Sequence, residues 1–231
     1  MARRVVLIRH NDGPFDDRVQ SFFQARGIEP ENRFPFRGEA LERPDESVAA
    51  SVIYGGRFNA YETDKHPFLI EENRWAEDCM ARGIPLLGIC QGAHQIAHVL
   101  GAHVGSKPGM PYDFGYYPIY ATEAGKAHMP DQLYVAQSHY HEFEVPRGAE
   151  RLAFSEVFPV QAMRVNEITF GFQFHAEVTR AGFRGWQEAP WAYYGKPGAQ
   201  TRERQDELGA AHDQAQHDWF MGFLERLFGA V

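Results

Sequence analysis

The sequence predicts an α/β fold: a doubly wound, mostly parallel sheet flanked by helices. Strand-like apolar runs alternate with helical patterns along the chain, which is typical of βαβ units whose strands run parallel. One such run, Ile84–Leu87, leads at once into a glycine-flanked cysteine and a helical pattern. This order places a nucleophile elbow at the carboxyl end of a strand. No repeat or low-complexity tract divides the chain, and residues 1–231 are expected to form a single domain.

The amino-terminal half supplies its elements in a regular order. Val5–Arg9 is an apolar run too short for the hydrophobic region of a signal peptide, and we interpret it as the first, central strand. A helix is expected around Asp17–Arg26, a buried strand over Val48–Tyr54 and a helix over Phe68–Arg82. Cys79 lies in the last of these at a spacing that indicates packing rather than reactivity.

The remaining chain is less regular. Shorter β-like segments are expected between Tyr116 and Phe172, and residues 33–45, rich in Pro, Arg and Glu, are interpreted as a surface loop near the site or a partner.

The region at about 180–231 begins with an aromatic stretch that includes Trp186, Trp191, Tyr193 and Tyr194. A helix is then expected over 201–228, with an apolar face at spacings of three and four made by Trp219, Phe220, Phe223, Leu224 and Leu227. We interpret this face as packing on its own domain, with an interface to a second copy or to a partner enzyme as the alternative.

The composition favours a compact, soluble enzyme. The net charge is −8 and the pI is near 5.8, which argues against nonspecific nucleic-acid binding and against a basic membrane patch. No long apolar run suggests a membrane span. With only Cys79 and Cys90 there is no disulfide framework, so the expected compartment is the reducing cytoplasm.

Motifs for metals and nucleotide cofactors are absent from the sequence. Ser138-His139-Tyr140-His141 holds two histidines, but nothing resembles the His-Glu-x-x-His helix of a zinc protease. Walker-type and dinucleotide-binding loops are also missing. We therefore expect no metal and no cofactor, and interpret the two histidines as part of a loop near an anionic site.

Cys90 is the candidate nucleophile. It stands in Gly88-Ile89-Cys90-Gln91-Gly92, where glycines on both sides leave room for a strained turn. The turn opens a helix, whose unpaired N–H groups and dipole favour thiolate over thiol. A lone buried cysteine is more often a small core residue, so it is the flanking pattern that predicts chemistry.

His175 and Glu177 are the candidate partners of this cysteine. Thr169–Phe174 is typical of a buried strand and runs directly into them, and alternation along an extended backbone puts both on one side. The histidine would take the cysteine proton while the carboxylate fixes its tautomer, as in a catalytic triad. A histidine at a strand end is more often structural, but together with Cys90 it favours catalysis.

These segments resemble the class I (triad-type) glutamine amidotransferases, in particular those similar to the glutaminase domain of GMP synthetase. The resemblance extends from about Ser51 to about Val178. Val52–Gly56 resembles the family's strand that ends in a glycine pair, Gly83–Gly92 its nucleophile segment and Phe114–Pro118 its short glycine-aromatic strand. Ser138-His139 and Pro146–Ala149 resemble the glutamine-facing loop and its exit, and Phe172–Glu177 resembles the histidine–glutamate end of the triad.

The resemblance implies a free-standing enzyme that hydrolyses the side-chain amide of glutamine. Cys90 would attack the carboxamide, His175 would move the protons and Glu177 would orient the histidine. A γ-glutamyl thioester would release ammonia first and then be cleaved by water. Backbone N–H groups of Gly56 and Gln91 would hold the oxyanion, whose charge develops only in the transition state. The residues implied to contact the small-molecule substrate are Gly55, Arg57, His94, Ser138 and His139.

Three positions depart from the family pattern. His94 stands four residues past the nucleophile, where the family usually has glutamine, Arg57 replaces a proline and His141 replaces an aspartate. Gln95 cannot simply substitute, because one residue is a rotation of about 100° around a helix. These changes leave the triad residues in place and put the identity of the amide substrate in question.

Three functions therefore remain open. The first is a glutamine amidotransferase or glutaminase that supplies ammonia to an unknown acceptor. Its expected partner is a separate synthetase subunit, because the chain has no ATP-binding motif. The second is a hydrolase of another γ-glutamyl amide. The third is a noncatalytic subunit that retains the fold, which the presence of Cys90, His175 and Glu177 argues against.

Overall fold

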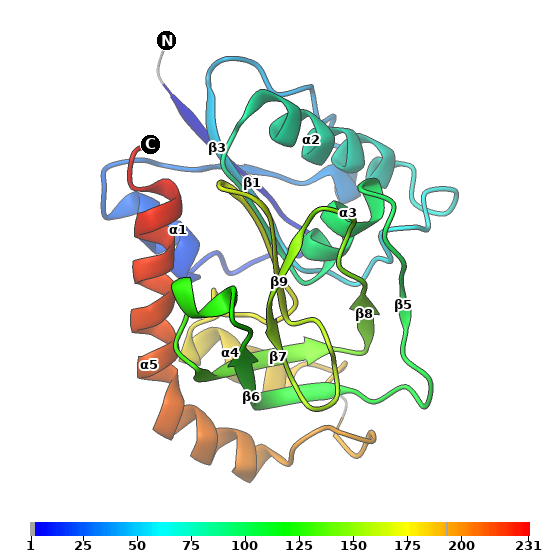
Figure 1. Ribbon diagram of the computed structural model, residues 1–231, viewed down its shortest axis with the longest axis vertical. Coiled ribbons are helices and arrows are strands. Elements are labelled where there is room, and N and C mark those ends of the chain that lie inside the picture. The colour runs from blue at the N-terminus through cyan, green and yellow to red at the C-terminus, as the bar shows by residue number, and fades with distance from the viewer. Residues whose placement is uncertain (1–2, 193) are drawn as a thin grey trace.

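A nine-stranded sheet forms the centre of the molecule. The computed structural model describes residues 3–192 and 194–231, so Tyr193 of the expected aromatic stretch lies outside the described residues. The strand order is β2-β1-β3-β4-β11-β10-β9-β6-β7. Figure 1 shows α5, coloured orange to red, along one side of the sheet and α2 and α3, in teal, on the other. The expected α/β sheet flanked by helices is confirmed.

Five strands make up the parallel part of the sheet: β2 (Glu31–Arg33), β1 (Arg4–Ile8), β3 (Val48–Ile53), β4 (Leu86–Ile89) and β11 (Thr169–Phe172). The sequence predicted β1 and β3 to within a residue at each end. The prediction that the first strand is central was wrong, because β1 lies second from the edge. On the side of β4 away from β3, the sheet is extended by strands that come from the second half of the chain.

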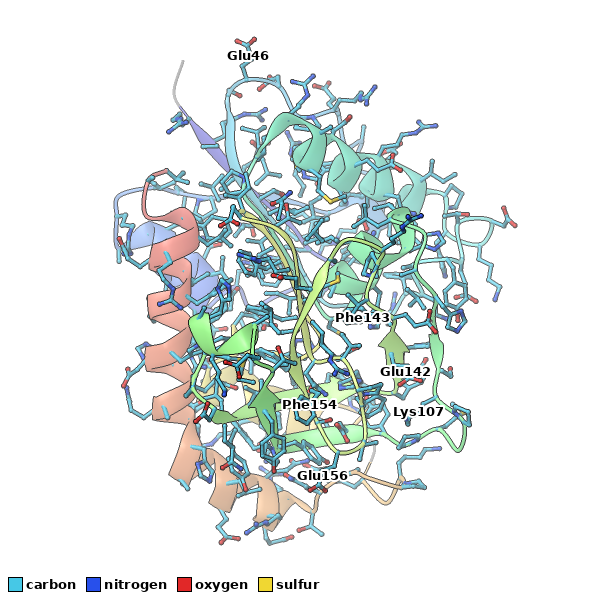
Figure 2. The ribbon with its side chains drawn as sticks, viewed as in Figure 1. Glu46, Lys107, Glu142, Phe143, Phe154 and Glu156 are labelled. Carbon is cyan, nitrogen blue, oxygen red and sulfur yellow. The ribbon has the colours of Figure 1, made fainter. Side chains whose placement is uncertain are left out.

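Four further strands continue the sheet in antiparallel pairings: β10 (Ala162–Asn166), β9 (Glu150–Phe154), β6 (Asp113–Ala121) and β7 (Gln132–His139). Shorter β-like segments were expected between Tyr116 and Phe172, and these strands lie there except that β6 begins earlier, at Asp113. A separate two-stranded sheet pairs β5 (Val104–Ser106) with β8 (His141–Phe143). Lys107 and Glu142, labelled in Figure 2, form an ion pair of 3.4 Å beside this small sheet.

The described part of the chain has five α-helices and two short 3-10 turns, with the last two helices following the last strand. They are α1 (Arg18–Gln24), η1 (Pro35–Arg37), α2 (Phe68–Arg82), α3 (Gln91–Val99), η2 (Gly125–Ala127), α4 (Arg180–Glu188) and α5 (Arg202–Phe228). Asp17 caps α1 by accepting from two backbone N–H groups, and Thr201 caps α5 in the same manner with one. Helix α2 has the predicted bounds and ends at Gly83, whose left-handed φ of 67° suits glycine. Helix α4 was not predicted. Among the described residues, no helix combines the length and the apolarity needed to cross a membrane.

The sheet separates two apolar layers. Val5 and Leu7 of β1 belong to the layer covered by α1 and α5, whereas Val6 and Ile8 belong to the layer covered by α2 and α3, as strand alternation requires. In the first layer, the α5 residues Phe220, Phe223 and Leu224 are buried with Phe170, Phe172 and Phe174. The interpretation of α5 as a helix packed on the body of the chain is therefore confirmed.

Residues 33–45 contain more structure than the expected loop. They include the last residue of β2 and the turn η1. The ring of Phe36 lies 6.2 Å from that of Phe58, centroid to centroid, and Phe58 closely follows the glycine pair after β3. This segment therefore reaches the neighbourhood of the candidate site, as expected.

Candidate active site

Cys90 occupies a strained turn between β4 and α3. Its φ of 50° and ψ of −107° fall in a region that L-residues rarely adopt and that is typical of functional sites. A Cβ on Gly88 would lie 2.5 Å from the Gly92 backbone, and one on Gly92 would lie 2.0 Å from the carbonyl oxygen of Ile53. Only glycine fits at these two positions, because α3 packs backbone to backbone against β4 and β3.

The pairing of β4 with β11 brings the second candidate segment to the cysteine. Phe172 is in register with Ile89, and the N–H of Cys90 donates to the carbonyl of Phe172 at 2.6 Å. Carboxyl ends of neighbouring parallel strands meet at one edge of a sheet. The chain therefore leaves β11 beside Cys90, two residues before the predicted strand end, and turns through residues 173–177.

His175 and Glu177 form a buried pair at this turn. Nδ1 of His175 lies 2.7 Å from Oε1 of Glu177, and each side chain is 7% exposed. The expected proximity is present, although a turn rather than an extended strand produces it. Because a carboxylate accepts, Nδ1 carries a proton and Nε2 is the nitrogen available to the sulfur. The second oxygen, Oε2 of Glu177, is buried without a hydrogen-bond partner among the described residues.

The surroundings of His175 favour its protonated form. Burial lowers the pKa of the imidazole, but the Glu177 carboxylate and the hydrogen bond with Cys90 outweigh burial and raise this pKa to about 10. The ring also packs edge-on against Trp186 of α4, with centroids 4.8 Å apart. An imidazolium beside a cysteine at a helix N-terminus favours the thiolate, which is the nucleophilic form.

Gln173 lies next to the sulfur, and the sequence did not single it out. Its Nε2 donates to Sγ of Cys90 at 3.9 Å, and its Oε1 accepts from Nε2 of His94 at 2.9 Å. Burial lowers the pKa of His94 to about 4, so this ring is neutral near pH 7 and holds the Gln173 amide in orientation. The one sequence signal was a polar residue between two phenylalanines in an apolar strand.

Gly55 and Gly56 place backbone without side chains beside the candidate site residues. A Cβ on Gly55 would lie 2.7 Å from Cε1 of His175 and 3.2 Å from Cβ of Cys90. A Cβ on Gly56 would lie 2.6 Å from Oε1 of Gln91. These distances are too short for a side chain, so the glycine pair lets the backbone pass close to Cys90, His175 and Gln91. Gln91 is the first residue of α3, where N–H groups have no partner within the helix.

Two of the predicted substrate residues remain accessible. Arg57 follows the glycine pair and is exposed, with its guanidinium carbon 5.3 Å from the ring centroid of Phe58. Ser138, near the end of β7, is half-buried, with its hydroxyl 3.5 Å from that of Tyr112. Both side chains can therefore meet a ligand that approaches from solvent.

The histidines of the 138–141 segment are buried and differ in their contacts. Nδ1 of His139 donates to the carbonyl of His141 at 3.0 Å, and its Nε2 lies 3.9 Å from Oδ2 of Asp113. Burial lowers the pKa of His139 to about 3 and raises that of Asp113 to about 7. His139 is therefore neutral near pH 7. His141 lies 3.4 Å from the hydroxyl of Tyr61, and its ring is 6.3 Å from that of His94.

Cys79 is packed in the core, as predicted. It is fully buried, and burial raises the pKa of its thiol to about 12, so the thiol is inert near pH 7. Within residues 3–192 and 194–231, no three His, Cys, Asp or Glu side chains are placed together to hold a metal ion.

An elbow cysteine beside a buried His–Glu pair, at the carboxyl edge of an α/β sheet, is typical of enzymes with a cysteine nucleophile. Comparison with known families narrows this class. The family description "Glutamine amidotransferase class-I" matches residues 33–184. The chain therefore belongs to the class I glutamine amidotransferases and is an enzyme of that family.

Individual relatives agree with this assignment. A glutamine-hydrolysing GMP synthase subunit of Pyrococcus abyssi is 36% identical over 179 residues, which cover 75% of this chain and 89% of the relative. The glutamine amidotransferase-like protein YfeJ of Salmonella typhimurium is 31% identical over 159 residues, 65% of this chain and 65% of the relative's length. A crystal structure of a glutamine amidotransferase from Thermotoga maritima superposes with a TM-score of 0.87 at 30% identity and covers 99% of both chains.

Proposed function

We propose that this chain hydrolyses the side-chain amide of glutamine through Cys90, His175 and Glu177. One observation carries the proposal. A cysteine on a strained elbow interacts with a histidine whose pKa is raised to about 10 by a carboxylate at 2.7 Å. That arrangement supplies a thiolate for attack and a proton for the leaving group within one site.

The reaction begins with the thiolate. Sγ of Cys90 bonds to the amide carbon of the substrate, and the C–N bond breaks as the His175 imidazolium gives its proton to the leaving nitrogen. Ammonia departs and a γ-glutamyl thioester remains on Cys90. The now neutral His175 takes a proton from water, whose oxygen attacks the thioester, and glutamate leaves as the thiolate and the imidazolium are restored. Glu177 keeps the imidazole in the required tautomer throughout.

The oxyanion of each tetrahedral intermediate would accept from the N–H groups of Gly56 and Gln91. Two features support this assignment. Gly56 has no side chain to cover its backbone, and the N–H of Gln91, in the first turn of α3, has no partner within the helix. Such donors act on charge that develops only in the transition state, and removal of one typically costs about 3 kcal/mol. Gln173 stabilises the thiolate by donating to Sγ of Cys90.

Gly55, Arg57, His94, Ser138 and His139 are the proposed substrate contacts. Arg57 is exposed directly after the glycine pair, and a guanidinium suits a substrate carboxylate. His94 and buried His139 act through the shape of the pocket, because their ring donors are engaged by Gln173 and by the carbonyl of His141.

A second candidate, hydrolysis of another γ-glutamyl amide, is favoured by the surroundings of His94. The family usually has glutamine at this position, whereas here a neutral histidine donates its ring N–H to the Gln173 side chain. His141 also lies where the family has aspartate. The end of the pocket that receives the amino-acid part of the substrate is thus chemically altered, while the reacting end is complete.

A separate synthetase subunit is the proposed acceptor of ammonia. The Pyrococcus abyssi relative is named for one subunit of a GMP synthase, which supports an arrangement in which glutamine hydrolysis and ammonia use lie on different chains. The proposed compartment is the cytoplasm, where reducing conditions keep Cys90 as a free thiol.

The test is release of ammonia and glutamate from L-glutamine and from a panel of γ-glutamyl amides, by wild type and by Cys90→Ala. Cys90-dependent release from L-glutamine is expected. Release from another γ-glutamyl compound alone would replace this function with the second candidate. Silence across the panel, with Cys90 no more reactive than Cys79 toward iodoacetamide, would favour a noncatalytic subunit.

A further inference from the structure

A second buried His–Glu pair lies beneath the glycine pair. His10 follows β1, Glu72 belongs to α2, and both side chains are fully buried, with Nε2 of His10 2.9 Å from Oε2 of Glu72. Neither residue is part of the Cys90 site described above. Replacing both partners of a buried hydrogen-bonded pair by apolar side chains of similar shape can be nearly neutral or stabilising, so packing alone gives this pair no evident purpose.

The hydrogen bonds of His10 point toward the loop that carries the glycines. Nδ1 of His10 lies 3.1 Å from the carbonyl oxygen of Tyr54. A carbonyl can only accept, so Nδ1 donates to Tyr54 and the Nε2 side of the ring faces the Glu72 carboxylate. The ring thus ties the end of β3 to α2 at the peptide immediately before Gly55.

Direct packing adds a second constraint on the loop. A Cβ on Gly56 would lie only 2.5 Å from Cβ and 2.9 Å from Cγ of His10. The backbone of Gly56 therefore packs directly on the His10 side chain. Oε1 of Gln91 accepts from the N–H of Phe58 at 3.0 Å, and Nε2 of Gln91 lies 3.0 Å from Nε2 of His10. The loop is therefore held at Tyr54 and Gly56 by His10, and at Phe58 by Gln91, whose amide nitrogen lies against the His10 ring.

A further contact fixes the acidic member of the pair. Nε2 of Gln95 on α3 donates to Oε2 of Glu72 at 2.8 Å. Gln95 does not replace the glutamine that the family has at His94. Its hydrogen bond to Glu72 links α2 to α3 instead. The two proposed oxyanion donors, on the loop and at the start of α3, are thereby connected through buried polar contacts.

We propose that His10 and Glu72 are positioning residues that hold the 54–58 loop so that the N–H of Gly56 points at the developing oxyanion. This inference rests on the proposed function of Cys90. Directional hydrogen bonds in a buried, low-dielectric site specify one geometry more sharply than an apolar contact does. The pair sets the position of a backbone donor, and takes no part in proton transfer at the substrate.

The test uses two reactions of Cys90 that differ in their need for the oxyanion site. Amide hydrolysis develops an oxyanion, whereas alkylation by iodoacetamide displaces iodide at carbon and develops none. The variants are His10→Leu, which removes the contacts of the ring with Tyr54, Glu72 and Gln91, and His10→Asn, which retains a donor in place of Nδ1. Glu72→Leu and Glu72→Gln form the matching pair, since the amide still offers His10 an acceptor.

Ser51→Ala is the matched control. The hydroxyl of Ser51 accepts from Nε1 of Trp75 at 2.9 Å, so this variant disturbs the same α2–β3 interface without touching His10 or the loop. Each variant is checked for native near-ultraviolet circular dichroism and for its Tm. A loss of activity that comes from general loosening of this interface would appear in the control as well.

His10→Leu and Glu72→Leu are expected to lower kcat by about 10- to 100-fold, with KM within about 2-fold of wild type, since the affected donor acts only in the transition state. The alkylation rate constant of Cys90 is expected to stay within about 2-fold of wild type, and His10→Asn and Glu72→Gln to recover most of kcat. Unchanged kcat, an equal fall in kcat and alkylation, or an equal fall in Ser51→Ala would overturn the positioning role. Absence of Cys90-dependent turnover in wild type itself would overturn the proposed function and this inference together.

Discussion

Replacing Glu177 by glutamine removes the charge that keeps His175 protonated. The carboxylate lies 2.7 Å from Nδ1, and two unit charges at that separation attract by about 6 kcal/mol at an effective dielectric constant of about 20. This is an upper value, because each charge is spread over several atoms. It corresponds to a change in the His175 pKa of about four to five pH units. Starting from about 10, the pKa in Glu177→Gln is expected to fall below the ordinary histidine value.

The loss of charge has a calculable effect on activity. With the His175 pKa below its ordinary value of 6.5, less than about a quarter of the imidazole would carry the second proton at pH 7, which alone costs at least about fourfold. Glutamine can also donate to Nδ1 and stabilise the wrong tautomer, as expected when the orienting acid of a triad is replaced by its amide. We expect kcat/KM at pH 7 to fall by about 10²- to 10³-fold, which is less than the loss in Cys90→Ala.

The assay is the pH dependence of kcat/KM together with that of Cys90 alkylation by iodoacetamide. Both should lose their neutral-pH plateau in Glu177→Gln. Glu188→Gln is the control, because it removes one carboxylate from an exposed ion pair with Arg202 on α4 and α5. A Glu177→Gln variant with at least a third of wild-type kcat/KM at pH 7 and an unchanged alkylation profile would refute the reasoning.

Other buried groups give three further predictions. Gln173→Leu removes the donor to Sγ of Cys90 and should slow iodoacetamide alkylation at pH 7 by about tenfold, and an unaltered rate would contradict this. Cys90 should be alkylated in the folded protein at pH 7 and Cys79 only after unfolding, because burial raises the pKa of Cys79 to about 12, which peptide mapping would check. Asp113 has its pKa raised to about 7 by burial, so it costs stability increasingly as pH rises from about 4 to about 7. The stabilising effect of Asp113→Asn on the free energy of unfolding should therefore grow over that range and then level off, and a gain that shrinks as pH rises would be inconsistent.

Stability should also depend on the protonation of His175. Its folded pKa of about 10 lies above the ordinary value of 6.5, so the protonated ring stabilises the fold fully below about pH 6.5. That contribution is lost as pH rises toward 10. The difference in unfolding free energy between wild type and His175→Gln, measured by urea denaturation, should decrease between pH 6.5 and pH 10. A difference that is constant across this range would contradict the coupling to Glu177.

The elbow was predictable because its determinants are local. Gly88 and Gly92 flank Cys90 within five residues, and their need for bare backbone follows from the turn itself. His175 and Glu177 were predictable for a similar reason, since two residues of separation suffice for contact in either a strand or a turn. The bounds of α2 could be read from its helical pattern and from Gly83 at its end.

The rest depends on contacts between distant parts of the chain. His94 and Gln173 are 79 residues apart, and His10 and Glu72 are 62 apart. No periodicity indicates that a polar residue in an apolar run will meet such a partner. The position of β1 near one edge was likewise not predictable from its own residues. It follows from four antiparallel strands that extend the sheet on the opposite side of β4.

The most direct test of Cys90 as the acyl carrier is intact-mass spectrometry of the protein quenched in acid during turnover of L-glutamine. We expect a mass increase of one glutamyl group, located on the peptide that contains Cys90 and absent from Cys90→Ala. Glutamine hydrolysis that continues in Cys90→Ala, with no adduct on the wild-type cysteine, would contradict the central claim that Cys90 carries the acyl group.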